Sequence, residues 1–235
     1  MINNEDIPGF KCSVAKKISY IFEAPFLAIP VFLILNLSLN YEKFLLIESI
    51  SLLFATILPI LFLVFWSKIK KIDKDYTVKE TRNFPLLIAV VIYFIGALIL
   101  WLLTANPLTI VLMFCYGTNT LIVFFINLKW KISVHAMGVT GPTTALMFYT
   151  PLGFLLGLFA PLIMWSRITL KKHTVGQVLA GSILGYILTF LQMFYLLKIM
   201  DFTLDIDIRL MIWIIFVLIL ISLILPFKKY LTDNS

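Results

Sequence analysis

The apolar run AMGVTGPTTALMFYTPLGFLLGLFAPLIMW, from Ala136 to Trp165, decides how this chain folds. As a single α-helix rising 1.5 Å per residue it would be about 45 Å long, whereas the hydrocarbon core of a bilayer is about 30 Å thick. The run also holds two helix-breaking dipeptides, Gly141-Pro142 and Thr150-Pro151. We therefore predict two short helices that turn near Thr150-Pro151.

The whole chain shares this apolar character. Hydrophobic residues make up 61% of the 235 residues and charged residues 13%, and the mean hydropathy is +1.03. Soluble proteins have roughly 45–50% apolar and 25% charged residues, so a soluble core could not absorb this much apolar surface. The composition predicts an all-α, polytopic membrane helix bundle that forms one integral membrane domain over residues 1–235.

Other apolar runs are long enough to cross a bilayer, and we predict spans near 18–39, 44–66, 84–105, 108–128, 174–198 and 208–227. With the two short helices this makes eight.

The polar N-terminus indicates no secretory signal, and Cys12 and Cys115 are expected to be free thiols. The GxxxG spacings Gly153/Gly157 and Gly181/Gly185 indicate close helix contacts. Glu23, inside the first predicted span, has either a structural or a functional role.

The basic residues are distributed unevenly over the predicted loops. Eight spans put the N-terminus, the 67–83, 129–135 and 166–173 loops and the C-terminus on one side. That side collects Lys11, Lys16, Lys17, Lys68, Lys70, Lys71, Lys74, Lys79, Arg82, Lys129, Lys131, Arg167, Lys171, Lys172, Lys228 and Lys229. The other side has only Lys43, Lys198 and Arg209. The positive-inside rule predicts an integral cell membrane protein whose termini are cytoplasmic, and the charge needs no nucleic-acid partner to explain it.

Both histidines of the chain lie in junctions between apolar runs. The junction from Trp165 to Gln177 reads WSRITLKKHTVGQ and includes Ser166, Arg167 and His173. We expect His173 to begin a helix with Gln177 one turn further on, so that the amide can bond one imidazole nitrogen and leave the other free for chemistry. The planar guanidinium of Arg167 suits phosphate oxygens.

Two further junctions are also basic. In KWKISVH, residues 129–135, His135 follows Ser133 at a predicted helix start, where free N–H groups favour anions. Ser133 either caps that helix or donates to a phosphate. In the junction at 73–82, Lys79 and Arg82 are three residues apart and would point the same way on a helical turn. Singly, such residues are usually solvated or follow topology, but two histidines with a cationic cradle suit phosphoryl transfer.

These residues carry a resemblance to a known family. Ser166-Arg167, five residues and then His173 resemble the third motif, SRxxxxxHxxxD, of the type 2 phosphatidic acid phosphatases. Ser133-Val-His135 is similar to the end of the PSGH motif of that family. Lys79 to Arg82 with Pro85 resembles a compact KxxxxxxRP motif. The resemblance covers roughly residues 73–185 and implies a six-helix phosphatase-like core within the bundle.

The resemblance implies a role for each matched residue. His173 would be the nucleophile that forms a phosphohistidine, and His135 would protonate the leaving oxygen and later activate water. Lys79, Arg82, Ser133 and Arg167 would hold the phosphate oxygens, with no metal and no cofactor. The substrate would be a lipid phosphate such as phosphatidate, phosphatidylglycerol phosphate, or a polyprenyl phosphate or diphosphate.

The chain departs from the family pattern at three places. Gln177 stands where the family has an aspartate, so it can set the tautomer of His173 but cannot stabilise an imidazolium by charge. The second motif lacks its proline and glycine, and either Lys74 or Lys79 can fill the lysine position of the first motif, of which we favour Lys79. Beside a lipid phosphatase, two alternatives remain: a non-catalytic lipid-headgroup binding or transport protein, and a structural membrane protein whose basic loops serve topology alone.

Overall fold

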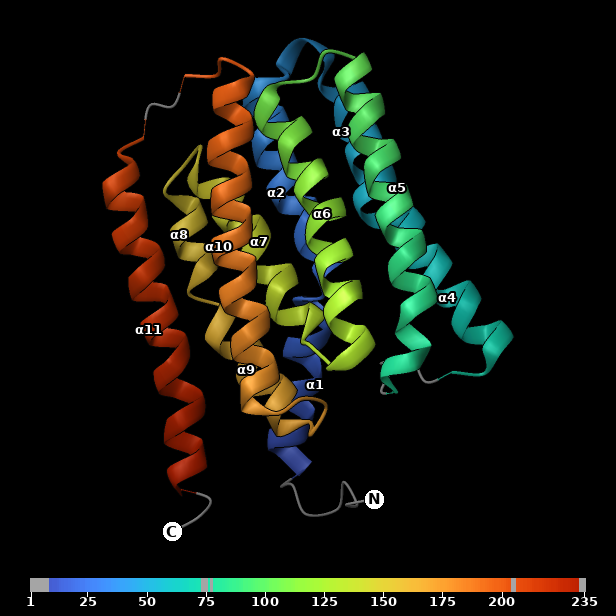
Figure 1. Ribbon diagram of the computed structural model, residues 1–235, viewed down its shortest axis with the longest axis vertical. Helices are drawn as coiled ribbons and strands as arrows, with labels where there is room; N and C mark the ends of the chain where they lie inside the picture. Colours follow the sequence, from blue (N-terminus) through green and yellow to red (C-terminus); the bar gives the residue numbers. More distant parts are fainter. Residues whose placement is uncertain (1–8, 73–75, 77, 204–205, 233–235) are drawn as a thin grey trace.

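The structure is a computed structural model that describes residues 9–72, 76, 78–203 and 206–232, and within them every regular element is helical. Lys74 and the side chains of Lys228 and Lys229 lie outside the described part. Figure 1 shows the long helices side by side along one axis. In chain order the elements are α1 (Gly9–Ile21), α2 (Ala24–Leu39), η2 (Tyr41–Lys43), α3 (Phe44–Leu52), η3 (Leu53–Ile57), α4 (Leu58–Lys70), η4 (Lys79–Arg82), α5 (Asn83–Leu102), α6 (Pro107–Lys129), α7 (Val134–Met147), α8 (Leu152–Gly157), α9 (Ala160–Thr169), α10 (Val175–Ile199) and α11 (Ile208–Thr232).

Membrane-spanning length and composition recur along the described chain. Five helical stretches are long and apolar enough to cross a bilayer: Tyr41–Lys70, Lys79–Leu102, Pro107–Lys129, Leu152–Thr169 and Val175–Ile199. The pair α1 and α2 can form a sixth, bent span, and Ile208–Leu223 is a shorter apolar helix. Large apolar side chains such as Leu61, Phe65, Trp101 and Trp213 are exposed on the outside of the bundle, where lipid would cover them. The prediction of an all-α, multi-pass membrane protein is confirmed.

The first predicted span, near 18–39, is wrong in its boundaries. The chain forms two helices there, α1 and α2, interrupted at Phe22 and Glu23. Pro25 cannot donate an N–H to the preceding turn, and Glu23 takes an extended conformation with φ −66° and ψ 138° as the N-cap of α2. As a result α1 packs against α9 instead of continuing the span.

The division of the Ala136–Trp165 run into two arms is confirmed. The first arm, α7, ends at Met147, and the chain turns before α8 begins at Leu152. Gly153 allows this turn to be tight, because a Cβ at that position would lie 2.4 Å from the backbone nitrogen of Met147. Figure 1 shows the chain running along α7 and returning through α8 and α9 to the end from which it started.

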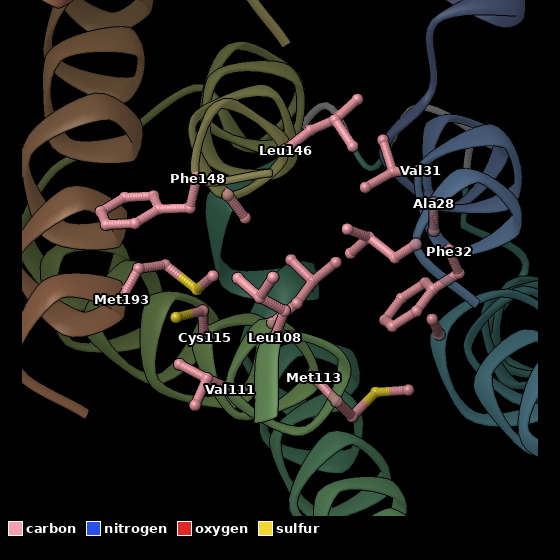
Figure 2. Packing of buried hydrophobic residues seen from close by; sticks show 14 of the residues in the cluster. Ala28, Val31, Phe32, Leu108, Val111, Met113, Cys115, Leu146, Phe148 and Met193 are labelled. Atoms are coloured by element: carbon pink, nitrogen blue, oxygen red, sulfur yellow. The ribbon is translucent and has the colours of Figure 1, made fainter. Parts of the chain in front are cut away.

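The apolar core lies where α2, α6, α7 and α10 meet. Figure 2 shows its side chains converging from all four helices, among them Ala28, Val31, Phe32, Leu108, Val111, Met113, Cys115, Leu146 and Met193. Cys115 is a buried free thiol and Cys12 a half-buried one, as expected. This core holds the helix ends that carry the junction residues in place.

Small residues bring α10 against α7, as the GxxxG spacing predicted. Added Cβ atoms at Gly181 and Gly185 would lie 2.5 Å from the carbonyl oxygen of Ser133 and 2.0 Å from the Thr140 hydroxyl oxygen. We expect Gly181→Ala to destabilise the protein by about 1–3 kcal/mol, because a backbone oxygen must move. Gly176→Ala is the matched control, since its Cβ would meet only Trp130 at 3.9 Å. Thermal unfolding in detergent checks this, and equal midpoints for the two variants would contradict the argument.

Candidate functional site

The three basic junctions lie at one end of the bundle. Figure 1 shows that α5, α7 and α10 begin at this end and that α4, α6 and α9 finish there. The helix α1 crosses the same end, beside α9. We call this region, made of residues 76–82, 129–135 and 166–174 of the described chain, the basic end. Both histidines belong to it.

His173 is oriented by a bifurcated contact at Gln177. The side-chain oxygen Oε1 of Gln177 lies 3.1 Å from His173 Nδ1 and 3.2 Å from the backbone nitrogen of Thr174. A backbone N–H can only donate, so the atom it meets is the amide oxygen and His173 Nδ1 must carry the proton that this oxygen accepts. The other ring nitrogen, Nε2, therefore holds a lone pair. It is buried and has no hydrogen-bond partner among the described residues.

The predicted start of α10 at His173 is two residues too early. The helix begins at Val175, and Thr174 is its N-cap, with a hydroxyl that accepts from the backbone N–H of Gln177. Thr174 and Gln177 form a capping box, which holds the amide of Gln177 back over the loop. The predicted contact between His173 and Gln177 is therefore present, but it depends on the cap and not on a shared helix face.

Burial and cations keep His173 uncharged. Desolvation, then the positive charges of Arg82, Arg167 and Lys131, lower the pKa of His173 to about 3 from its ordinary 6.5, while the hydrogen bond with Gln177 acts in the opposite direction. A pKa well below neutrality means that the imidazole is neutral at physiological pH. A neutral imidazole with a free Nε2 lone pair is the nucleophilic form.

His135 belongs to the same site as His173. It lies in the first turn of α7 and is half-buried. The residues that interact with it electrostatically are Arg167, His173 and Arg82, which come from the two other junctions. The fold thus gathers both imidazoles and two guanidinium groups in one place. Two such rings can divide the roles of nucleophile and proton carrier.

Arg167 is fixed by α1. It is almost fully buried, and its Nη1 donates to the hydroxyl oxygen of Ser19 at 2.7 Å. The neighbouring Ser166 hydroxyl donates to the carbonyl oxygen of Ala15 at 2.8 Å. Ala15 and Ser19 are small and one turn apart, which lets α1 approach α9 closely. Ser19 was not predicted at the site from the sequence, although the spacing of small residues could have signalled a packed helix face.

Arg82 and Lys79 both reach the junction that follows α6, but they do different things there. Arg82 is buried, and it donates to the carbonyl oxygens of Tyr76 at 2.7 Å and Ile132 at 3.3 Å. The ammonium of Lys79 lies 3.1–3.2 Å from the carbonyl oxygens of Leu128 and Lys129, so it caps the C-terminus of α6. Arg82 acts electrostatically on both histidines, whereas Lys79 is occupied with the helix end.

Ser133 and Lys131 complete the basic end. Of the two roles weighed for Ser133, the structure shows the cap: its hydroxyl oxygen accepts from the backbone N–H of Ala136 at 3.3 Å. Lys131 donates to the carbonyl oxygen of Lys172 at 2.8 Å and contributes to the lowered pKa of His173. From the sequence, Lys131 was assigned only to the charge bias of the loops, although its position two residues before Ser133 could have indicated that it belongs to the candidate site.

No match to this chain is found among protein-family models, curated proteins or solved structures. The fold and the geometry of the basic end define it as a multi-pass helical membrane protein with a cationic, histidine-bearing site. Among the described residues no cluster of three or more histidine, cysteine or acidic side chains is placed to hold a metal ion.

Proposed function

We propose that this protein is a membrane phosphatase that hydrolyses a lipid phosphate, or a polyprenyl phosphate or diphosphate, through a phosphohistidine on His173. The observation that carries the proposal is the state of His173. One ring nitrogen is held by Gln177, and the other is buried near cationic side chains and a second histidine and has no hydrogen-bond partner in the described part of the chain. The resemblance to the type 2 phosphatidic acid phosphatases at these positions agrees with this assignment.

The reaction runs in two displacements. The lipid phosphate binds as its monoanion and passes its proton to His135. His173 Nε2 then attacks the phosphorus atom, the bond from phosphorus to the lipid oxygen breaks, and His135 gives that proton to the lipid oxygen. The positive charges of Arg82 and Arg167 offset the charge on the phosphoryl oxygens. His135 then takes a proton from water, whose oxygen attacks the phosphohistidine and releases inorganic phosphate and free His173. The sum is one lipid phosphate and one water giving a lipid alcohol and phosphate.

An apolar cavity beside α7, the helix whose first turn carries His135, supports a lipid substrate. It has a volume of about 70 Å³ and lies between α5, α6, α7 and α10. Its lining is chiefly apolar and includes Val134, Met137 and Gly138, from the turns of α7 that flank His135. The first carbon atoms of a lipid chain could lie there while the phosphate meets the basic end. An acyl and a prenyl chain would both suit such walls.

The proposal includes a topology. We propose eight spans, made by counting α7 and the α8–α9 arm as one pass each, with a six-helix phosphatase-like core that contains residues 73–185. The excess of lysine and arginine at the basic end favours a cytoplasmic site and cytoplasmic termini. A reporter enzyme fused to the C-terminus, active only in the cytoplasm, tests the orientation independently of the activity.

The experiment that tests the function is phosphate release by the purified full chain in detergent, in the presence of a chelator. The panel contains phosphatidate, phosphatidylglycerol phosphate, a polyprenyl phosphate and a polyprenyl diphosphate. We expect release from one lipid class without added metal. No release from any of them, with each lipid shown to bind, would support the second candidate function instead.

That second candidate is a lipid-headgroup binding or transport protein without hydrolysis, and Gln177 is the observation that favours it. A neutral amide holds His173 in the right tautomer but adds no negative charge to stabilise the cationic ring that forms as Nε2 bonds to phosphorus. Tight binding of a lipid phosphate without turnover would identify this function.

Gln177→Glu separates the two candidates. Glutamate keeps the chain length that places Oε1 beside His173, and it also preserves the capping box with Thr174. A hydrogen bond to a charged partner is worth about 1–1.5 kcal/mol more than a neutral one, so we expect the rate of phosphate release to rise about tenfold. Gln177→Leu, which abolishes the contact, should lower it. A rate that is unchanged in both variants would contradict the role of Gln177.

A further inference from the structure

A second buried polar cluster lies at the end of the bundle opposite to the basic end. Asn36 of α2, its C-cap Asn40, Glu48 and Ser51 of α3 and Thr109 of α6 form it, close to the connections that Figure 1 shows at that end. Asn36 is its centre: its Nδ2 donates to Glu48 Oε2 at 2.8 Å and to Ser51 Oγ at 3.1 Å, and its Oδ1 accepts from Asn40 and Thr109. The cluster ties three helices together.

Glu48 is the unusual member, because it is an acid inside a membrane-spanning stretch. Its side chain lies within Tyr41–Lys70 and the residue is only 7% exposed. Oε2 accepts a single hydrogen bond, from Asn36, and Oε1 is buried without a partner among the described residues. Asn36 already uses both of its amide hydrogens, so it has nothing further to donate to Oε1.

No cation among the described residues neutralises Glu48. The helix α2 and η3 carry no titratable side chain, and the titratable groups on the other elements packed near α3 are Tyr41, Glu42 and Lys43 of η2, Tyr93 of α5, and Cys115, Tyr116 and Lys129 of α6. None of them forms a hydrogen bond or an ion pair with Glu48. Of the two cations in that set, Lys129 lies in the last turn of α6, at the basic end. The ammonium of Lys43 lies 3.2 Å from the carbonyl oxygen of Leu103 and 2.9 Å from the hydroxyl oxygen of Thr104.

An ionised carboxylate in this position would lose its hydration and gain one hydrogen bond, which is strongly unfavourable in a bilayer. We propose that Glu48 is an intramembrane proton-binding site, neutral when α2, α3 and α6 are packed as in this structure and reached from the end of the bundle opposite to His173. The proton resides on Oε1, the oxygen that no neighbour contacts. This proposal does not depend on the phosphatase reaction.

The neighbouring oxygens argue for a proton and against a metal cation. Asn36 Oδ1 accepts two hydrogen bonds, Thr109 Oγ1 accepts one from Asn40, and Ser51 Oγ accepts one from Asn36 while donating to the Ile47 carbonyl. Both lone pairs of Asn36 Oδ1 are thus engaged, and Thr109 Oγ1 and Ser51 Oγ keep only one lone pair each, whereas a sodium or calcium ion needs several free oxygen ligands. A proton needs only one.

Loss of this proton would act on the packing of the helices. A carboxylate at Glu48 would be stabilised by hydration, and water can reach it only if α3 moves away from α2 and α6. The segment that follows, η3, is a π-helical turn over Leu53–Ile57, a kind of irregularity that is frequent at functional sites and gives a helix a point at which to shift. Glu48 thereby makes the packing of α3 sensitive to protonation.

The test compares Glu48→Gln, which resembles the protonated acid, with Glu42→Gln, the same change at an exposed position six residues away. Thermal unfolding of the full chain in detergent is measured between about pH 7 and about pH 10. We expect the unfolding midpoints of the wild type and of Glu42→Gln to fall as the pH rises over this range. Their fall should exceed any fall in the midpoint of Glu48→Gln by about 4 °C or more. The infrared spectrum of the wild type at neutral pH should contain a carboxylic-acid carbonyl band that Glu48→Gln lacks.

Three results would overturn the proposal. The first is a Glu48→Gln protein whose midpoint follows that of the wild type with pH, and the second is the absence of the infrared difference. The third is stabilisation of the wild type by sodium over choline chloride that is lost in Glu48→Gln, which would assign a metal cation to the site. A Glu48→Gln chain that fails to fold also counts against a neutral Glu48, because glutamine is the closest neutral match in shape.

Discussion

Replacing His173 by alanine is expected to reduce phosphate release by about 10³-fold or more, to the background rate. The reason is specific to this side chain, since Nε2 of His173 is a buried imidazole nitrogen with a lone pair and no hydrogen-bond partner among the described residues. The measurement is single-turnover and steady-state phosphate release from the preferred lipid, together with trapping of an acid-labile phosphoprotein from labelled substrate.

The matched control for this variant is Lys129→Gln, which removes an exposed cation at the basic end without touching either histidine. It should retain release and the phosphoprotein. Retention of both in His173→Ala would remove the proposed mechanism. Loss of release with continued binding of the lipid is the expected outcome, and it shows that the site is still assembled.

Substitution of Arg167 by lysine is expected to lower kcat/KM by about 100-fold, although the charge is conserved. The guanidinium is held by Ser19 of α1 through Nη1, so its remaining N–H groups have a set direction. A lysine ammonium is a point charge on a flexible chain. It cannot both bond Ser19 and present a planar pair of donors to a phosphate.

A control in the same junction is Lys171→Gln, whose side chain is exposed. This variant should behave as the wild type. The kcat/KM of Ser19→Ala should lie between those of Lys171→Gln and Arg167→Lys, because this variant keeps the guanidinium but removes one of its anchors. Equal kcat/KM for Arg167→Lys and the wild type, with both well folded, would show that Arg167 serves the structure and not the phosphate.

The class of the fold was predictable because its signals are local. Apolar runs about 20 residues long must be membrane helices wherever they lie, and Pro151 stops a helix for a steric reason that needs no tertiary contact. The same logic failed at the first span, where the apolar residues resume directly after Glu23 and Pro25. There the proline outweighed the hydropathy, and the chain formed α1 as a separate helix.

The composition of the candidate site was predictable in part. The spacing of Arg167, His173 and Gln177 is short enough that one loop and one cap bring them together. The pairing of His173 with His135 was expected from a shared side of the bundle, and the electrostatic interaction between them agrees with that expectation. The role of Lys79 at the end of α6 was not foreseen, because the target of a long flexible side chain depends on which carbonyls happen to be near.

Chain length, hydropathy and helix breaking were enough to predict the membrane helices, most of their ends and the three basic junctions, because these properties depend on neighbours along the chain. The protonation state and tautomer of His173, the anchoring of Arg167 by Ser19, and the contact of Glu48 with Asn36, with no cation beside it among the described residues, follow from the fold. These depend on the distances between segments far apart in the chain. Burial and hydrogen bonding at such contacts, not residue type, set the chemistry of each group.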